Sequence, residues 1–224
     1  MNRDYSQRGF TLVELMIAMA VGLIVLGAMY SVFTLQNKQF GQQDMVTEMQ
    51  QNARAGIEMM VREIRMAGYN PAKKTTGWSA SPTTSPGRTP GVVTANASDI
   101  TFVADLDGNS DTTYTSNANE NITYDLCPAA TCASCSWQCL ARTSNGTITP
   151  AAENIETLTF KYYNSSGTEL TAPVGAADLA NIRKIEVTIG ARSSKEDPSY
   201  TSSSGDHYYH YEVKSQVTLR NMGL

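Results

Sequence analysis

The sequence predicts an α+β fold in which one long N-terminal helix packs on a C-terminal antiparallel β-sheet. Three observations lead to this prediction: an apolar run over residues 10–33, an amphipathic continuation through residues 34–70, and later segments in which apolar and polar residues alternate. A helix buries one stripe of side chains and a sheet buries one face, so the two elements are expected to cover each other.

The apolar run reads FTLVELMIAMAVGLIVLGAMYSVF and contains one charged residue, Glu14. About 20 apolar residues are enough for a helix to cross the hydrocarbon core of a bilayer. The preceding segment, MNRDYSQRG, carries Arg3 and Arg8, which favour retention of this end in the cytoplasm. A carboxylate inside an apolar helix is costly, and Glu14 is therefore expected to have a partner and a function.

The second half of the helix is predicted from apolar residues that recur in steps of three and four. Gly68 and Asn70-Pro71 are typical of a helix end. A continuous helix over residues 10–67 would be about 85–90 Å long at 1.5 Å per residue. The residues that share one face are Val46, Met49, Ala53, Ile57, Met60, Ile64 and Ala67.

The N-terminus resembles the class III signal peptide of type IV prepilins and type II secretion pseudopilins. The resemblance rests on a short basic leader ending in Gly9, followed by Phe10, Glu14 and the apolar helix. It implies that a prepilin peptidase cleaves between Gly9 and Phe10 and N-methylates Phe10. Cleavage would create an α-ammonium at Phe10, one helical turn from Glu14. In a filament, Glu14 could neutralise the Phe10 ammonium of a neighbouring subunit and so fix the register of assembly.

Two other interpretations of the N-terminus are less consistent with the residues. A secretory signal peptide would have a shorter apolar run and a small-residue cleavage site at its end. A simple membrane anchor would leave Glu14 without a role. The resulting division is a leader at 1–9, a transmembrane or filament-core helix at 10–33, its amphipathic continuation at 34–70 and a periplasmic β-rich head at 71–224.

The head contains several strand-like segments separated by polar loops. Residues 73–91 and 193–206 are expected to be loops because they are rich in Ser, Thr, Pro and Gly. A short helical turn is expected near Asp178-Leu179-Ala180. The predicted strands are residues 100–103, 122–126, 137–142, 155–163, 182–192 and 208–220.

Composition limits the classes of function. Of 224 residues, 17% are charged and the net charge is −4, without the clustered Lys and Arg of a nucleic-acid interface. About 190 residues remain after the leader and anchor, enough for one domain with its own core. Abundant Ser, Thr, Asn and Gly suit an exported β-rich surface. His207 and His210 would face opposite sides of the sheet on a strand, so they are not expected to share a metal. The sequence contains no nucleophile motif or phosphate loop, and an enzyme is therefore not expected.

Four cysteines have the spacing C-x4-C-x2-C-x3-C: Cys127, Cys132, Cys135 and Cys139. In an oxidising compartment such a group is expected to form two structural disulfides. The C-x-x-C element could also be half of a zinc site or a redox pair. The three possible disulfide connectivities remain open.

An acidic loop is the candidate metal site, with Ca²⁺ as the possible cofactor. Its side-chain oxygens alternate along DLDGNSD, at Asp105, Asp107, Asn109 and Asp111. The glycine is not at the EF-hand position, and position twelve is Ser116. A solvated turn that binds no metal is the alternative, since Asp, Asn and Gly are ordinary turn residues.

The whole chain is most similar to PilW-type minor pilins, which are related to the J-type pseudopilins of type II secretion. The similar segments are GFTLVELMIAM, residues 65–69 (RMAGY), residues 105–109 before the 122–124 strand, and residues 219–221. This resemblance implies a structural subunit that initiates, primes or caps pilus assembly. The alternatives are a type II secretion pseudopilin and a pilus-tip binding module, either an adhesin or a DNA receptor.

The same resemblance implies the location and the partners of the chain. The protein would lie in the inner membrane, with its head in the periplasm, and later in the pilus. Its partners would be other minor pilins, the major pilin, the prepilin peptidase and the inner-membrane assembly platform, with no nucleic acid expected.

Overall fold

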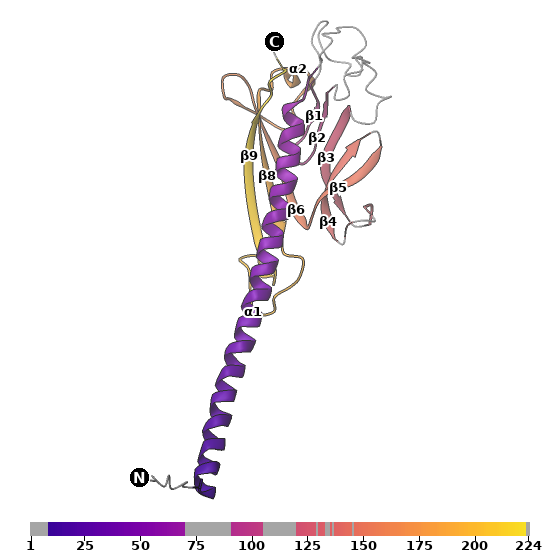
Figure 1. Ribbon diagram of the computed structural model, residues 1–224. Coiled ribbons are helices and arrows are strands. Elements are labelled where there is room, and N and C mark those ends of the chain that lie inside the picture. The colour runs from indigo at the N-terminus through magenta and orange to yellow at the C-terminus, as the bar shows by residue number, and fades with distance from the viewer. Residues whose placement is uncertain are drawn as a thin grey trace, which may run out of the picture. The chain divides into compact units, whose positions relative to one another are not determined.

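The computed structural model describes residues 9–69, 91–104, 120–128, 130–132, 135, 137–144 and 146–222 (Figure 1). The chain forms two compact units, Met1–Asp44 and Met45–Leu224. One helix, α1 (Leu12–Arg65), contributes residues to both units, and all described strands belong to the second.

The first part of α1 exposes its apolar side chains. Phe10, Leu23 and Phe40 are 83%, 69% and 62% exposed, respectively. Among the described helices, α1 has the length and apolar composition to cross a membrane. This part of the helix therefore has the features predicted for a membrane or filament-core segment.

The second part of α1 is the helical layer of the head. Its buried residues follow the predicted three-and-four spacing: Met49, Ala53, Gly56, Ile57, Met60 and Ile64. The helix is followed by Gly68, which has φ of +75° and donates its N–H to the carbonyl of Val103 at 2.8 Å. A glycine in this left-handed conformation is a common helix stop.

The first sheet contains five antiparallel strands in the order β1-β2-β3-β4-β5, so each strand pairs with its neighbour in the chain. The strands are β1 (Val92–Ala95), β2 (Ile100–Val103), β3 (Asn121–Pro128), β4 (Gln138–Ser144) and β5 (Thr147–Glu153).

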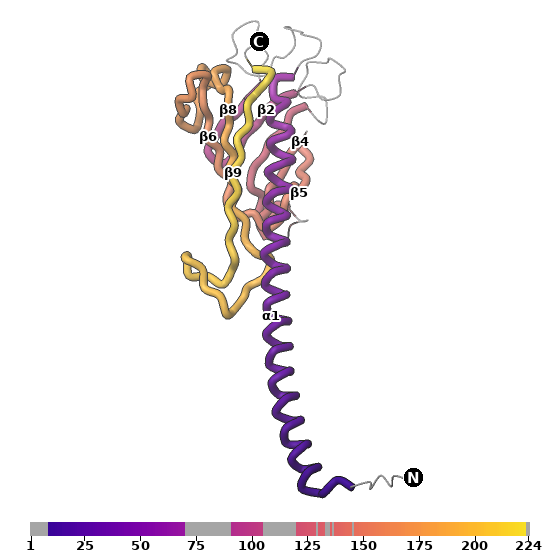
Figure 2. The backbone as a smooth tube through the Cα atoms, turned by 60° about the vertical axis from the view of Figure 1, so that its left-hand side comes forward, coloured from indigo at the N-terminus to yellow at the C-terminus, as the bar shows by residue number. Residues whose placement is uncertain are grey.

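The second sheet has the order β7-β6-β8-β9, and its three long strands lie side by side in Figure 2. Its strands are β6 (Ile155–Tyr163), β7 (Glu169–Leu170), β8 (Lys184–Arg192) and β9 (His210–Thr218); the short helix α2 (Ala176–Leu179) precedes β8. Strand β9 is an edge strand, and alternate residues along it are exposed.

The predicted α+β class, with a long helix on antiparallel strands, is confirmed, but the strands form two sheets rather than one. The chain passes from the first sheet to the second at Asn154, which is buried and has φ of +57°. Asn is one of the residues that tolerate this conformation. The carbonyl of Asn154 accepts a hydrogen bond from Arg192 N at 3.0 Å, which fixes this junction against β8.

A single apolar core joins α1 to both sheets. The helix approaches the first sheet closely at Gly56, where an added Cβ would lie 2.9 Å from Ala152 Cβ and 3.1 Å from Leu140 Cδ2. The largest fully buried side chains include Tyr124, Phe102, Phe160 and Tyr162. Tyr162 also donates its hydroxyl to the carbonyl of Asn96 at 2.7 Å, which links β6 to the β1–β2 turn.

Candidate functional site: the N-terminal helix and the contacts that hold the head

Thr11 caps the start of α1. Its Oγ1 accepts a hydrogen bond from Glu14 N at 3.3 Å, and its carbonyl accepts one from Leu15 N at 3.2 Å. Thr11 and Glu14 have the T-x-x-E spacing of a capping box. A carboxylate in the first turn also offsets the positive end of the helix dipole. Glu14 therefore suits the start of this helix in addition to any role toward another subunit.

The residues of the predicted cleavage site are exposed. Gly9 precedes the helix without regular structure, and Phe10 and Glu14 are exposed side chains. The peptide bond between Gly9 and Phe10 is thus two residues before the first residue of α1. The structure describes the position of these residues, and their cleavage, methylation and assembly roles stay predictions.

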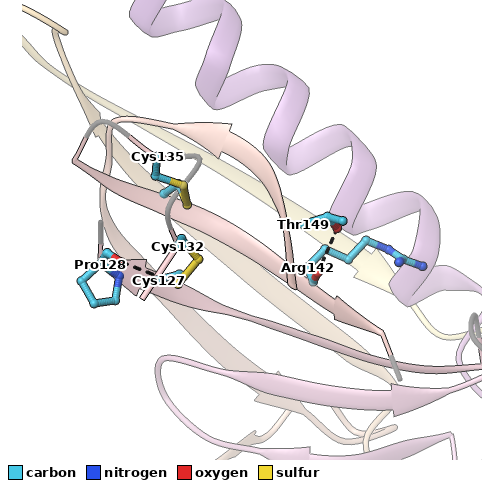
Figure 3. Close-up of a disulfide and its surroundings, with 7 residues drawn as sticks. Cys127, Pro128, Cys132, Cys135, Arg142 and Thr149 are labelled. Atoms are coloured by element: carbon cyan, nitrogen blue, oxygen red, sulfur yellow. Dashed lines mark hydrogen bonds between the residues drawn. A yellow bond between two sulfur atoms is a disulfide. The ribbon is translucent and has the colours of Figure 1, made fainter. Parts of the chain in front are cut away.

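An ionic contact fastens the amphipathic part of α1 to the first sheet. Arg142 Nε on β4 lies 2.9 Å from Glu63 Oε2 on the helix, and Tyr124 on β3 donates its hydroxyl to the same oxygen at 2.6 Å. Figure 3 shows the Arg142 side chain extending toward the helix. Burial and the Glu63 carboxylate both raise the pKa of Tyr124, so its hydroxyl remains a donor.

The four cysteines form two disulfides, Cys127–Cys132 and Cys135–Cys139. Cys127 lies near the end of β3 and Cys139 near the start of β4, and Figure 3 shows Cys127, Cys132 and Cys135 in this region. The four side chains are buried together with Ala141 in a small second cluster, separate from the main core. The connectivity that the sequence left open is therefore between consecutive cysteines, and the described chain has no free cysteine.

Trp137, which lies between Cys135 and Cys139, connects the cysteine segment to the second sheet. The Arg192 guanidinium carbon on β8 lies 3.5 Å from the ring centroid of Trp137 and 4.2 Å from that of Tyr208. Such stacking on aromatic faces is favourable for a guanidinium. The stack joins the cysteine segment to β8 and to the loop that precedes β9.

The polar loop between β8 and β9 is built around two carboxylates. Asp197 is buried and accepts hydrogen bonds from Tyr209 Oη at 2.8 Å and Ser199 Oγ at 2.6 Å. Burial, followed by this carboxylate, raises the pKa of Tyr209 to about 12. Asp206 accepts from Ser202 Oγ at 2.6 Å, and this bond is the main reason that the pKa of Asp206 is lowered to about 2.

His210, at the start of β9, bridges two carboxylates. Its Nδ1 lies 2.9 Å from Glu156 Oε2 and its Nε2 lies 3.0 Å from Asp206 Oδ1. Partial burial lowers the pKa of His210, but the hydrogen bonds with both carboxylates outweigh this and raise it overall. Glu156 is the extra residue of the irregularity where Ile155 pairs with Ala191 and Thr157 with Gly190. His207, by contrast, contacts the carbonyl of Tyr200, so the two histidines have different hydrogen-bond partners.

The candidate Ca²⁺ ligands Asp105, Asp107, Asn109 and Asp111 lie outside the described residues, and Ca²⁺ binding stays a prediction. Among the described residues, one group of Cys, His, Asp or Glu is close enough to hold a metal: Cys132, Cys135 and Cys139. In the structure these three sulfur atoms are in disulfides and are not available as thiolate ligands.

A capped apolar helix with an acidic first turn, continuing into a β-rich head, is the architecture of a type IV pilin-like protein. Residues 5–30 match the prokaryotic N-terminal methylation motif. Residues 42–219 match the family described as prepilin peptidase-dependent protein B, and the chain belongs to this family.

The chain was also compared with solved structures and with curated proteins. A type IV-like pilin from Thermus thermophilus is similar in structure, with a TM-score of 0.42 and 10% sequence identity over 78% of this chain and 97% of that one. A likeness of this size carries no argument about function. No curated protein matches the chain in sequence.

Proposed function

We propose that this chain is a minor type IV pilin, a structural and non-enzymatic subunit that initiates, primes or caps pilus assembly. The observation that carries the proposal is a 54-residue helix that begins two residues after Phe10 and whose first part exposes apolar side chains. The match to a prepilin peptidase-dependent family supports processing at that bond. The head then contributes the surface by which one minor subunit differs from another.

The proposed mechanism begins with the precursor in the inner membrane and its head in the periplasm. Cleavage after Gly9 leaves an ammonium at Phe10, next to the positive end of the α1 dipole. This arrangement is unfavourable by itself, and the carboxylate of Glu14 offsets it. In a filament, Glu14 pairs with the Phe10 ammonium of a neighbouring helix, while the exposed apolar side chains exchange lipid contacts for helix contacts. The partners are other minor pilins, the major pilin, the prepilin peptidase and the inner-membrane assembly platform.

The first test is the intact mass of the membrane-extracted protein, produced with and without an active prepilin peptidase. The expected product is residues 10–224 carrying one added methyl group. Glu14→Gln removes the charge at nearly constant size. In this variant we expect processing to continue and incorporation into pili to fall at least tenfold, measured by mass spectrometry of sheared filaments.

The control is Glu58→Gln, which removes an exposed carboxylate elsewhere on α1 and should leave incorporation unchanged. An unprocessed mass in the presence of the peptidase would contradict the pilin proposal. A processed chain that is absent from pili, and whose loss abolishes protein secretion, would instead identify a type II secretion pseudopilin.

A further inference from the structure

The strand register and the disulfide pairing of the four cysteines do not coincide. Cys127 on β3 lies directly opposite Cys139 on β4 in the antiparallel ladder. Opposed residues in such a ladder are near neighbours on one face. Each of these cysteines is nevertheless bonded elsewhere, Cys127 to Cys132 and Cys139 to Cys135.

The two disulfides are also close to each other. The Sγ atoms of Cys132, Cys135 and Cys139 all lie within 4.8 Å of one another. Cys132 belongs to one disulfide and the other two form the second, so one sulfur of the first bond is adjacent to both sulfurs of the other. All four side chains are at most 6% exposed. A thiolate formed in this cluster would therefore have a neighbouring disulfide as its nearest electrophile.

We propose that the cysteine cluster is a thiol–disulfide exchange site with a second permitted pairing, Cys127–Cys139 together with Cys132–Cys135. The strand register places the first pair face to face, and the sulfur positions bring the second pair together. The third connectivity is Cys127–Cys135 together with Cys132–Cys139. Cys127 and Cys135 are not opposite each other in the strand register, and Cys127 is not one of the three cysteines whose sulfur atoms lie within 4.8 Å of one another. The structure thus favours two of the three connectivities.

The exchange needs an external dithiol to begin and a disulfide oxidant to end. The dithiol transfers two electrons and two protons to Cys135–Cys139 and leaves as its own disulfide. The Cys135 thiolate then attacks Cys132 Sγ, so the Cys132–Cys135 bond forms, the Cys127–Cys132 bond breaks and Cys127 leaves as a thiolate. The oxidant finally removes two electrons from Cys127 and Cys139, whose protons go to solvent as their bond forms.

The second pairing changes which parts of the head are tied together. In the observed pairing, Cys132 is bonded to β3 and Cys135 to β4, so both are held by the sheet. In the second pairing the two strands are bonded to each other, and Cys132 and Cys135 only to one another. Trp137 lies two residues after Cys135 and stacks on Arg192, so the surroundings of its ring should change when the pairing changes.

The direct test maps disulfides in the full-length chain in detergent. The protein is incubated with a mixture of reduced and oxidised dithiothreitol, which supplies the dithiol and the disulfide oxidant, and is then quenched with acid, alkylated, digested and analysed by mass spectrometry. We expect only consecutive pairs before incubation and both permitted pairings afterwards. Recovery of the consecutive pairing alone, or the appearance of Cys127–Cys135, would overturn the proposal. This experiment requires no variant to fold.

Double variants test the same geometry separately. Cys132→Ser/Cys135→Ser leaves Cys127 and Cys139, which should close to a disulfide on mild oxidation and resist alkylation. Cys132→Ser/Cys139→Ser leaves Cys127 and Cys135, which should remain alkylatable under the same conditions. Cys135→Ser/Cys139→Ser keeps the Cys127–Cys132 bond, and its near-UV circular dichroism spectrum is the reference for a folded head with one disulfide. If Cys132→Ser/Cys135→Ser gives the same spectrum but retains two free thiols, the proposal is contradicted.

Discussion

Glu63 connects the helix to the first sheet through a contact that is mostly removed from water. The side chains of Arg142 and Glu63 are 17% and 22% exposed, and Tyr124 adds a hydrogen bond to the same carboxylate. A pair of this kind contributes modestly when complete, but removing one charge leaves the other poorly solvated. The contact therefore specifies how α1 sits on β3 and β4 more than it adds to total stability.

Replacing Glu63 by Gln should lower the free energy of unfolding of the head by about 1–3 kcal/mol, because Arg142 loses its charged partner. Chemical denaturation followed by circular dichroism measures this change. Glu58→Gln, an exposed substitution on the same helix, should change the free energy of unfolding by less than about 0.5 kcal/mol. Equal effects of the two substitutions would show that the Glu63 contact contributes nothing specific.

His210 should make the stability of the head depend on pH. Its pKa in the folded state is raised above the ordinary value of 6.5 by Asp206 and Glu156. The stabilisation is therefore fully present below pH 6.5 and is lost as the pH rises through the folded-state pKa. The Asp206 contribution has the opposite sign: it is present above pH 3.8 and is lost as the pH falls toward about 2.

The measurement is chemical denaturation of the native chain and of His210→Gln between pH 5 and 9. The difference in unfolding free energy should be largest at pH 5 and shrink toward pH 9. His207→Gln is the matched control, because its imidazole contacts a carbonyl rather than a carboxylate. A difference that does not vary with pH would show that the two carboxylates do not act on the His210 charge.

Residues that interact over long sequence distances could not be predicted from the sequence. Glu63 and Arg142 are 79 residues apart, and their contact depends on both the helix rotation and the β4 register. The stack of Trp137 on Arg192 depends on how two sheets meet, for which the alternation pattern contains no signal. The cysteine pairing was open for a different reason: the four cysteines are close together in the sequence, and their spacing does not choose among the three connectivities. Thr11 and Glu14, in contrast, are a local pair with a recognisable T-x-x-E spacing.

The helix was the most predictable element. The structure places α1 at Leu12–Arg65, within two residues of each predicted end, because an apolar run and an amphipathic period are strong signals over such a length. Six predicted strands are also present, with small changes at their ends. The short helical turn predicted near Asp178 corresponds to α2.

Three strands were missed, and each lacks a clear alternating pattern. Strand β7 has two residues, and β1 has four. Strand β5 reads TITPAAE, contains Pro150, and is mostly exposed at a sheet edge. Proline is tolerated at such an edge but argues against a strand when only the sequence is considered.

Gly56 should be the least replaceable position on the buried face of α1. A Cβ there meets Ala152 at 2.9 Å, so the helix must move away from β5 to accept any side chain. We expect Gly56→Val to lower the free energy of unfolding by about 1–3 kcal/mol through overpacking. Ala55→Val places the same side chain on the exposed face and should cost less than about 1 kcal/mol, its helix-propensity penalty. Thermal denaturation of the two variants distinguishes these outcomes, and similar melting temperatures would contradict the close approach.

The second unit should fold by itself when the chain is truncated at the boundary between the two units. A chain lacking residues 1–44 retains every described strand and the buried part of α1. We expect it to unfold cooperatively, with near-UV circular dichroism like that of the complete protein. Because each lost core side chain costs roughly 2–5 kcal/mol, removing residues 1–66 should prevent folding of the head. A folded head without residues 45–66 would contradict the central role of α1.

The division of the strands into two sheets was not predictable, although the class of fold was. Alternation shows which face of a strand is buried, but it does not show which strand lies beside it. The change of sheet occurs at one residue, Asn154, between β5 and β6. A single Asn is common in many kinds of turn, so nothing in the sequence marks it as the boundary.

Strand β9 is the last strand of its sheet, and this position has a consequence for how copies of the head behave at high concentration. Glu212 and Lys214 are 59% and 61% exposed and lie in the middle of this nine-residue edge strand. An unprotected edge of this length is a template for pairing with another chain, and charged side chains, lysine above all, discourage such pairing. Copies of the head that meet at high concentration can therefore remain separate molecules and avoid amyloid-like aggregation.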